Sequence, residues 1–456
     1  MAEKKRKKLR LTTAQLILLG FLGVVLLGSA LLSLPFAAAD GRSVAYIDAL
    51  FTAVTSTCVT GLVTLPTVTA WSVFGQIVIL LLIQIGGLGV ITVMAWFMLL
   101  LHRKIGISRR LLIQDAFNLN TMSGLVHFVK KVTVGTLAVE GGGALLYMIA
   151  FVPRFGARGI WISVFTSVSA FCNAGIDILA ENSLCDYVLD PLVNFVTCVL
   201  ITLGGIGYIV WWDVIRVFRE HGHDRGFRRW ANLTLHSKIA LTVSLILVLG
   251  GASGFLLFEY RNPLTIGGFT LPQKIQAALF QSVTTRTAGF ATLPQQDLTN
   301  ASAILSLVLM FIGGSPVGTA GGIKTVTIAI VLVTAFSVIK GRSDVSLFHR
   351  RLSESAVRKA TAVVCYSFLT ALVSTLLLAA VTDASVIDLL YETVSATATV
   401  GLSRNLTSRL ELMGKLILCV TMYFGRVGPI SFAIALNGKP QNENVIKNPT
   451  EEISVG

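Results

Sequence analysis

Charged residues are scarce in this sequence. Asp, Glu, Lys and Arg make up 13% of the 456 residues, whereas hydrophobic residues make up 54%. Soluble domains carry roughly 25% charged residues, so the composition excludes an ordinary soluble domain and indicates an integral membrane protein. The six cysteines lie singly, without a CxxC pair, which argues against a disulfide framework and against a zinc site.

Paired acids and an HExxH motif are also missing, so the sequence predicts neither an intramembrane enzyme nor a cofactor site in this chain. His221 and His223 lack further metal ligands at a suitable spacing, and residues 219–235 are better interpreted as a solvated loop. Glu140 falls inside an apolar run. An intramembrane acid is a functional-site hypothesis by default, but the sequence assigns this one no role.

The net charge of +14 reflects topology rather than nucleic-acid binding. Six basic residues lie in each of four segments, 1–10, 102–131, 216–238 and 340–359, and two more lie in the tail 439–456. By the positive-inside rule these segments face the cytoplasm. We therefore expect a multi-pass plasma-membrane protein with both termini cytoplasmic.

Four related stretches recur along the chain. They are LFTAVTSTCVTGL (Leu50–Leu62), VFTSVSAFCNAGI (Val164–Ile176), LFQSVTTRTAGF (Leu279–Phe290) and YETVSATATVGL (Tyr391–Leu402). Their closing glycines, Gly61, Gly175, Gly289 and Gly401, are separated by 114, 114 and 112 residues. This period predicts one unit used four times. The third copy has one residue fewer between its valine and its glycine.

Each unit is predicted to contain a span, a short re-entrant helix, an extended strip and a second span. The first spans are Thr13–Leu34, Val132–Phe151, His236–Phe258 and Ala356–Val381. The short helices are Val44–Ser56, Ala157–Ala170, Leu271–Val283 and Ser385–Ala396. The first to fourth strips are Thr57–Leu62, Phe171–Ile176, Thr285–Phe290 and Thr397–Leu402. The return spans are Trp71–Leu101, Pro191–Phe218, a broken helix from Ala301 to about Lys340, and Leu412–Leu436.

The fold class is thus an all-α membrane protein. It has four parallel repeats and eight transmembrane helices around a pseudo-fourfold pore. The repeats occupy residues 1–101, 102–218, 219–340 and 341–456, with a polar tail from Asn437. The N-terminus resembles a signal peptide, but 22 residues from Thr13 suit an uncleaved span better. The basic, amphipathic segment 102–131 is expected to form a cytoplasmic surface helix, either a connection or a docking surface.

The third return span is interrupted by a glycine-rich segment. The gate residues predicted there are Gly313, Gly314, Ser315, Pro316, Gly318, Thr319, Ala320, Gly321, Gly322 and Lys324. Five glycines and a proline within ten residues cannot hold a stable helix. Arg426 stands in the fourth repeat where Gly87 and Gly205 stand in the first two. The arginine and the carbonyls of the break are expected to meet and to form a gate. The alternative is that Arg426 only pins helices together, with Glu140 as one possible partner.

Non-helical backbone at membrane depth is tolerated only inside protein or around water. Four strips around one axis would supply rings of carbonyl oxygens, which replace the hydration shell of a potassium ion. The short helices direct their C-terminal ends toward the pore and so favour cations. GTAGGIKT in the break superficially resembles a phosphate-binding loop, but Ile323 separates Gly322 from Lys324 and the flanks are apolar, so nucleotide binding there is not expected. Inverted repeats, typical of conventional secondary transporters, are not predicted.

With these motifs in view, the sequence resembles the Trk/Ktr/HKT superfamily of potassium transporters. The resemblance rests on TCVTGL, AFCNAGI, TRTAGF, TATVGL, GGSPVGTAGGIKT and YFGRVGPI, covers nearly the whole chain, and is greatest to the Ktr membrane subunit. It implies a homodimer of bacterial type on a cytosolic nucleotide-binding ring, with sodium as an activating or a coupled ion. It implies these filter residues: Cys58, Val59, Thr60, Gly61, Cys172, Asn173, Ala174, Gly175, Arg286, Thr287, Ala288, Gly289, Ala398, Thr399, Val400 and Gly401.

In this superfamily a serine in place of the first filter glycine is associated with sodium selectivity, so Gly61 implies potassium. The transported ions at the filter carbonyls are the only metal expected. A sodium-permeable or sodium-coupled member of the same fold is the nearest rival. A purely structural or receptor-like membrane protein fits less well, because it would have no use for four re-entrant strips.

Overall fold

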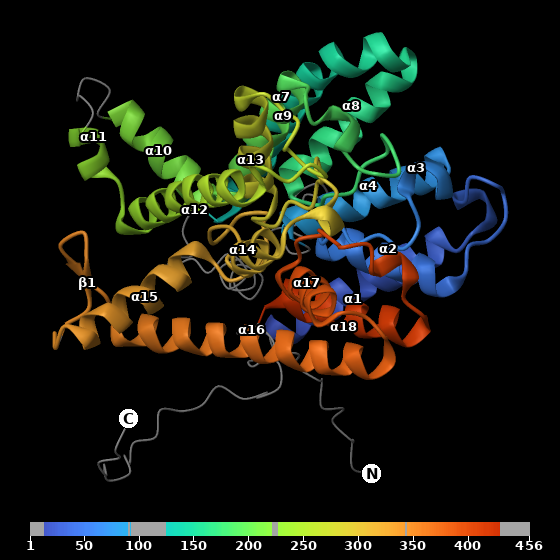
Figure 1. Cartoon of the computed structure of the whole chain (residues 1–456). Helices are drawn as coiled ribbons and strands as arrows, with labels where there is room; N and C mark the ends of the chain where they lie inside the picture. Colours follow the sequence, from blue (N-terminus) through green and yellow to red (C-terminus); the bar gives the residue numbers. More distant parts are fainter. Residues whose placement is uncertain (1–12, 90–91, 93–124, 221–226, 343, 429–456) are drawn as a thin grey trace, which may run out of the picture.

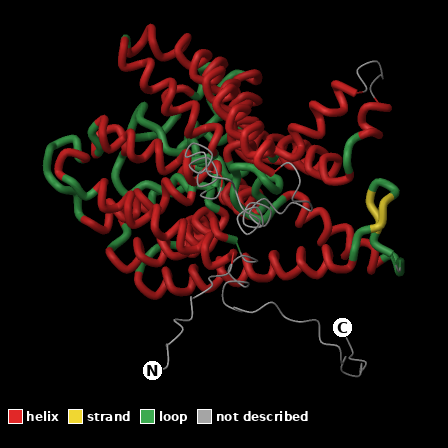
Figure 2. Tube along the Cα trace, turned by 180° about the vertical axis from the view of Figure 1, so that it is seen from behind, coloured by secondary structure: helices red, strands yellow, loops and turns green. Residues whose placement is uncertain are grey.

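The computed structural model describes residues 13–89, 92, 125–220, 227–342 and 344–428. Most of these residues are helical, and loops connect the helices (Figures 1 and 2). The described part contains one small sheet, an antiparallel hairpin of β1 (Ser346–Leu347) and β2 (Arg350–Arg351). Helices therefore supply nearly all of the framework that positions the strips.

Four long apolar helices each have enough length and hydropathy to cross a bilayer. They are α1 (Thr13–Leu32), α7 (Leu125–Phe155), α12 (Leu235–Glu259) and α16 (Glu354–Val381). Their outer faces expose large apolar side chains, among them Leu145 at 66%, Leu257 at 73% and Leu376 at 63%. Such faces are unfavourable in water and fit a hydrocarbon surround, as expected for a helical membrane protein.

Each long helix is followed by a short one that packs against it. The short helices are α2 (Tyr46–Cys58), α8 (Ala157–Cys172), α13 (Leu271–Thr284) and α17 (Val386–Ala398). With 13 to 16 residues they fall below the roughly 20 needed to span a bilayer. All four continue one or two residues beyond their predicted ends. Three of them, α2, α8 and α17, persist until a left-handed residue stops them. The first residues of the predicted strips, such as Thr57 and Cys58, are therefore helical.

The return segments differ from one repeat to the next. The helices are α4 (Val73–Leu88), α9 (Pro191–Gly205) with α10 (Tyr208–Glu220), α14 (Asn300–Phe311) with α15 (Thr325–Ile339), and α18 (Leu412–Val427). Short connecting helices are η1 (Pro35–Ala37), α3 (Thr67–Ala70), η2 (Cys185–Tyr187), η3 (Gln295–Asp297) and η4 (Thr407–Arg409). Helices α4 and α18 end at glycines with φ of 83° and 81°, Gly89 and Gly428.

The return segment predicted over Pro191–Phe218 consists of two helices rather than one. Helices α9 and α10 meet at an angle of 96°. Gly207 takes a φ of 91° at the corner, and the last carbonyls of α9 bond outside their own helix. The backbone N–H of Ser315 donates to Gly205 O at 2.8 Å, and that of Thr319 donates to Gly204 O at 3.1 Å. The bend follows because the interrupted third return segment occupies the position where α9 would continue.

The predicted interruption of the third return segment is confirmed. Helix α14 ends at Phe311 and α15 begins at Thr325, and we call the residues between them, Ile312–Lys324, the break loop. Its two ends are joined by the bond from Gly313 N to Ile323 O, 3.0 Å, and by that from Thr325 N to Gly314 O, 3.0 Å. The two ends of the break loop therefore lie side by side, held together by these hydrogen bonds.

Several predictions concern segments that the structure does not describe. Of the expected surface helix 102–131, residues 125–131 are described and belong to α7. The ends of the return spans beyond Thr92 and Gly428, and the tail from Asn437, lie outside the described residues. The expected loop 219–235 is partly helical, since α10 extends to Glu220 and α11 covers Phe227–Asn232.

The corner at Gly207 generates a stability prediction. A Cβ atom there would overlap the carbonyl oxygen of Pro316, and the φ of 91° is unfavourable for any L side chain. We expect Gly207→Ala to lower the stability of the folded protein by about 1–3 kcal/mol. Thermal unfolding of purified protein in detergent measures this.

Gly141→Ala provides the matched control. Gly141 lies inside helix α7, and nothing lies within 4 Å of an added Cβ atom. This change should leave the melting temperature equal or slightly higher, because alanine favours a helix interior. Equal melting temperatures for Gly207→Ala and the unmodified chain would contradict the strained corner.

Candidate functional site

The four strips share one backbone pattern. A residue with φ between 51° and 69° stands near the end of each short helix: Val59, Asn173 and Thr399 follow their helices directly, whereas Thr287 lies three residues after the end of α13. Two residues later comes a glycine with positive φ, namely Gly61, Gly175, Gly289 and Gly401. In the first, second and fourth strips the left-handed residue ends the helix. In all four strips the glycine permits the next turn of the backbone. All four predicted filter segments therefore begin in the same register.

The closing glycines meet one another around a ring. A Cβ atom on Gly61 would overlap the carbonyl oxygen of Ala174, and one on Gly175 would overlap that of Ala288. A Cβ atom on Gly289 would overlap Val400 O, and one on Gly401 would overlap Thr60 O. The contacts thus lead from the first strip to the second, third and fourth and back to the first. Segments more than 100 residues apart are brought together in one closed circle of backbone.

Glycines on the return helices permit a second set of close approaches. A Cβ atom on Gly86 would overlap Thr57 O, one on Gly204 would overlap Phe171 O, and one on Gly425 would overlap Thr397 O. Thr57, Phe171 and Thr397 each stand four residues before the closing glycine of their strip. The mid-span glycines noticed in the sequence therefore let the return helices pack directly against the ends of the short helices.

A hydroxyl group in the last turns of every short helix holds the strip that follows. Thr55 Oγ1 accepts from Gly61 N at 3.0 Å, and Ser395 Oγ accepts from Gly401 N at 3.0 Å. Ser169 Oγ accepts from Ile176 N at 3.2 Å, and Thr284 Oγ1 donates to Phe290 O at 2.6 Å. We call these four residues the hydroxyl clamps. The sequence analysis missed them, although a Ser or Thr five or six residues before each glycine was the available signal.

The third strip differs from the others in its turn. In the other three strips an N–H bonds back to a carbonyl five residues earlier, as in Thr60 N to Thr55 O at 2.8 Å. In the third, Ala288 N bonds Thr284 O, four residues earlier, at 3.0 Å. The tighter turn thus compensates for the missing residue, and Gly289 takes the same position in its strip as the other closing glycines. The side chain of Arg286 bonds Ser244 on α12 and Gly313 O in the break loop, at 3.0 to 3.3 Å.

The break loop lies against the inner ends of the strips. Thr319 Oγ1 donates to Phe171 O at 2.9 Å, and Gly321 N donates to Thr287 Oγ1 at 3.1 Å. A Cβ atom on Gly321 would overlap Thr399 Oγ1. The loop therefore touches the second, third and fourth repeats at the bases of their strips. Ser315 Oγ and Thr325 Oγ1, 2.9 Å apart, add a further bond at its neck.

Arg426 joins the break loop to two return helices. From α18 it donates through Nη1 to Thr319 O at 2.7 Å and through Nη2 to Gly86 O, near the end of α4, at 2.6 Å. Lys324 donates from the base of the loop to Ala320 O at 2.6 Å. Both cations line a cavity of about 400 Å³ together with Gly318, Gly321 and Thr397. The predicted contact between Arg426 and the loop is present, and so is a pin between helices.

Glu140 takes no part in this cluster. Its carboxylate accepts from Gln84 Nε2 at 3.2 Å and lies 3.7 Å from Cys172 Sγ. No ion pair joins it to Arg426 in the part of the chain that the structure describes. The suggestion that Arg426 pairs with Glu140 is therefore wrong. The carbonyls of Thr319 and Gly86 satisfy the arginine instead.

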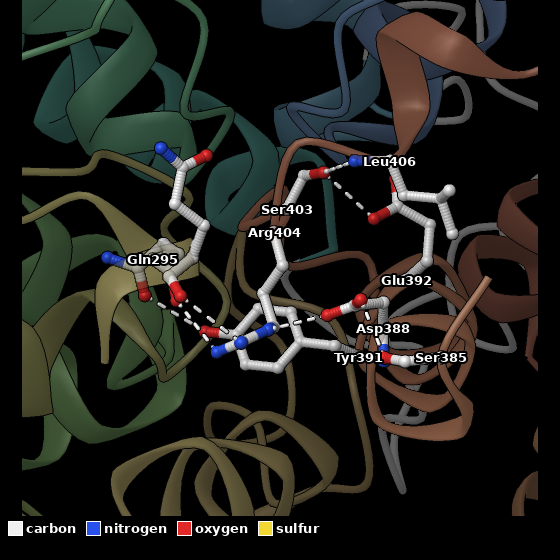
Figure 3. Close-up of polar contacts among 9 residues, drawn as sticks. Gln295, Ser385, Asp388, Tyr391, Glu392, Ser403, Arg404 and Leu406 are labelled. Atoms are coloured by element: carbon white, nitrogen blue, oxygen red, sulfur yellow. Dashed lines mark hydrogen bonds and ion pairs between the residues drawn. The ribbon is translucent and has the colours of Figure 1, made fainter. Parts of the chain in front are cut away.

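A polar cluster beyond the strips ties the third and fourth repeats together (Figure 3). Arg404, three residues after Gly401, donates Nε to Asp388 at 2.7 Å and its two terminal nitrogens to Gln295 O and Gln296 O, at 3.0 and 3.2 Å. Glu392, buried in α17, accepts from Ser403 Oγ at 2.8 Å and from Thr407. These residues were not predicted from the sequence, since polar contacts between separate segments leave no periodic signal.

Comparison with known proteins bears on this arrangement. A sequence model of the TrkH family, described as cation transport protein, matches residues 2–447. The chain belongs to the TrkH family of cation transport proteins. It is therefore a transporter of a multi-pass membrane family and not an enzyme.

Individual TrkH-family relatives match over nearly their whole length. The potassium/sodium uptake protein NtpJ of Enterococcus hirae is 38% identical over 99% of both chains. The Ktr system potassium uptake protein B is 36% identical in Bacillus subtilis, over 100% of this chain and 99% of that one. In Vibrio alginolyticus it is 34% identical, over 99% of this chain and 97% of that one. The crystal structure of the potassium transporter TrkH from Vibrio parahaemolyticus superposes with a TM-score of 0.73 at 19% identity, over 95% of this chain and 86% of that one, and supports the fold.

The hydroxyl clamps generate a prediction for this TrkH-family site. Thr55→Val keeps the side-chain shape but leaves the buried N–H of Gly61 without its acceptor. We expect a loss of about 1–3 kcal/mol of stability, the cost of an unsatisfied buried donor. Thermal unfolding in detergent is the measurement. Thr55→Ser retains the hydroxyl and should recover most of the loss. If the Thr55→Val and Thr55→Ser variants have the same melting temperature, the hydrogen bond from Gly61 N to Thr55 does not hold the strip.

Proposed function

We propose that this chain takes up potassium through a pore formed by its four strips. In this proposal eight transmembrane helices in four parallel repeats surround a pseudo-fourfold axis. The observation that supports it is the closed ring of backbone contacts through Gly61, Gly175, Gly289 and Gly401. A ring of this kind has no structural purpose for a helix bundle. It supports the proposal because it would bring carbonyl groups of all four strips around one centre.

Carbonyl oxygens can replace the water that a potassium ion sheds. The proposed filter residues are those of the four segments Cys58–Gly61, Cys172–Gly175, Arg286–Gly289 and Ala398–Gly401. The C-terminal ends of the short helices carry partial negative charge and favour a cation at the centre. Thr57 and Thr397 also have buried hydroxyl oxygens that lack a hydrogen-bond partner within the described residues. We infer that these oxygens meet hydrated ions at the inner end of the filter.

The similarity to proteins named for potassium uptake supports potassium as cargo, as does glycine at position 61. A second candidate is a sodium-permeable or sodium-coupled transporter of the same fold. It is favoured by the 38% identical relative, which is named for both ions. The two candidates differ in whether sodium moves with potassium or only stimulates its uptake. Uptake of potassium or rubidium into proteoliposomes, measured with sodium varied on each side, tests the proposal and separates them.

The break loop and Arg426 serve as the gate in this proposal. The loop lies at the inner ends of the strips, and Arg426 places a positive charge beside them. A fixed cation there repels a passing cation. Lys324 adds a second one. Opening would shift the loop between two arrangements.

For location and partners, we infer a bacterial plasma-membrane protein with cytoplasmic termini. We also infer a homodimer bound to a cytosolic nucleotide-binding ring, as the family resemblance implies. The basic residues of α11 and of the β1–β2 hairpin support a cytoplasmic side at that end of the molecule (Figure 1). Light scattering of the purified protein tests the dimer. Without the nucleotide-binding ring, the purified chain should conduct potassium equally well with and without added nucleotide.

The ring generates a selectivity prediction. A side chain at Gly61 meets Ala174 O and strains a backbone with φ of 96°, so the carbonyl positions must shift. We expect Gly61→Ser to lower the preference for potassium over sodium by about tenfold, or about 1.4 kcal/mol. Relative permeability in proteoliposomes measures this. Gly41→Ser, at a φ of 73° in an open exposed loop, is the matched control and should keep the preference. An unchanged preference in Gly61→Ser would contradict the filter assignment.

The proposed gate predicts that two variants raise potassium flux, whereas simple damage to the protein would lower it. Arg426→Ala removes the charge and releases Thr319 O, and deletion of Gly318–Gly321 removes the part of the loop beneath the strips. We expect each to raise potassium flux in folded, membrane-inserted protein. Arg409→Ala, an exposed arginine on η4, should leave flux unchanged. If both gate variants lose flux while remaining folded, the arginine and loop are structural supports and not a barrier.

A further inference from the structure

An apolar groove runs along the side of the molecule behind the break loop. It measures about 630 Å³, within the range of roughly 300–1,000 Å³ typical of small-ligand sites. Its walls come from α9 and α12, including Ile201, Thr202, Leu241 and Leu245. The flank on α12 is open, since Leu245 and Ile246 are 60% and 62% exposed. In a membrane protein this opening faces hydrocarbon, so an acyl chain can enter it sideways.

The two ends of the groove differ in chemistry. One end is closed by Val283, Arg286 and Gly314, so it touches the third strip and the break loop. The guanidinium of Arg286 is turned to Ser244 and to Gly313 O, which leaves mostly apolar surface toward the groove. The other end is closed by Trp230 of α11. Tryptophan is the residue typical of the boundary between hydrocarbon and headgroups.

Basic side chains surround the Trp230 end. Arg228 is exposed beside it on α11, and Lys238 lies one turn into α12, where it donates to Ala231 O at 2.8 Å. The tip of the β1–β2 hairpin also packs here, with the ring of Phe348 6.5 Å from that of Trp230, and it carries exposed Arg350. Two acidic residues of the described chain near this end, Asp213 and Asp344, are paired with Arg216 and Arg351. The local charge is therefore positive.

From these observations we propose that the groove holds one anionic phospholipid. Its acyl chain lies between α9 and α12, and its headgroup meets Arg228 and Lys238. The charge at one end and the hydrocarbon walls match the two halves of such a molecule, and each basic residue near an anionic headgroup adds about fivefold in binding. The end of the acyl chain contacts Gly314, so the bound lipid packs against the break loop.

Photolabelling of the purified full chain in nanodiscs tests this site without any measurement of transport. The probes are phosphatidylglycerol and phosphatidylcholine that carry a diazirine either near the glycerol or at the end of the acyl chain. With two basic residues at the headgroup, we expect phosphatidylglycerol to label groove peptides on the order of 25-fold more than phosphatidylcholine. The label near the glycerol should modify the region around Trp230 and Lys238, and the terminal label should modify the region around Val283 and Gly314.

Variants distinguish the groove from general contact with lipid. Leu245→Trp fills the groove and should abolish the preferential labelling. Arg228→Gln with Lys238→Gln should reduce the phosphatidylglycerol preference while leaving the acyl-chain contact. Leu376→Trp, on the exposed face of α16, is the control and should change neither.

Equal labelling by the two lipids would overturn the proposal. So would labelling that Leu245→Trp does not change. Absence of groove adducts would mean that a second copy, or an undescribed segment of this chain, covers the groove, and would also overturn it.

Discussion

Backbone packs against backbone at Gly61, Gly175, Gly289 and Gly401, with no room for a Cβ atom at any of the four. This contact constrains everything around it. Four strips can meet so closely only if four short helices deliver their ends to the same place. Gly86, Gly204 and Gly425 let return helices press against three of those helix ends. The hydroxyl clamps then fix each strip to the helix that precedes it.

The third repeat departs from the shared plan, and its neighbours adapt to it. Its strip turns within one residue fewer, and its return segment is interrupted by the break loop. The loop takes the place into which α9 would otherwise extend, and α10 leaves at 96°. Arg426 of the fourth repeat reaches the loop from the opposite direction. The ring of four strips is therefore nearly symmetric, whereas the break loop that lies against it comes from the third repeat alone.

The repeat period, the short helices and the break at Gly313 could be predicted because each leaves a local mark in composition or spacing. The bend between α9 and α10 could not. Its cause is the packing of residues 315–319, more than 100 positions away, and Gly207 looks like its equivalents in repeats one and four. The contact of Arg426 with the loop followed from aligning the repeats. Its second bond, to Gly86 O, did not, because a carbonyl has no sequence signature. Arg404 and Glu392 were missed for a related reason, since their partners lie on other segments of the chain.

The bonds of the break loop have a consequence for hydration. The loop supplies N–H groups to Gly204 O and Gly205 O and accepts hydrogen bonds from Tyr208 N and from Arg426. A displaced loop would leave these groups without partners, at a cost of about 1–3 kcal/mol for each one that stays dry. Water is the only general replacement available to all of them at once. Any movement of the loop would therefore require water to enter the space that the loop leaves.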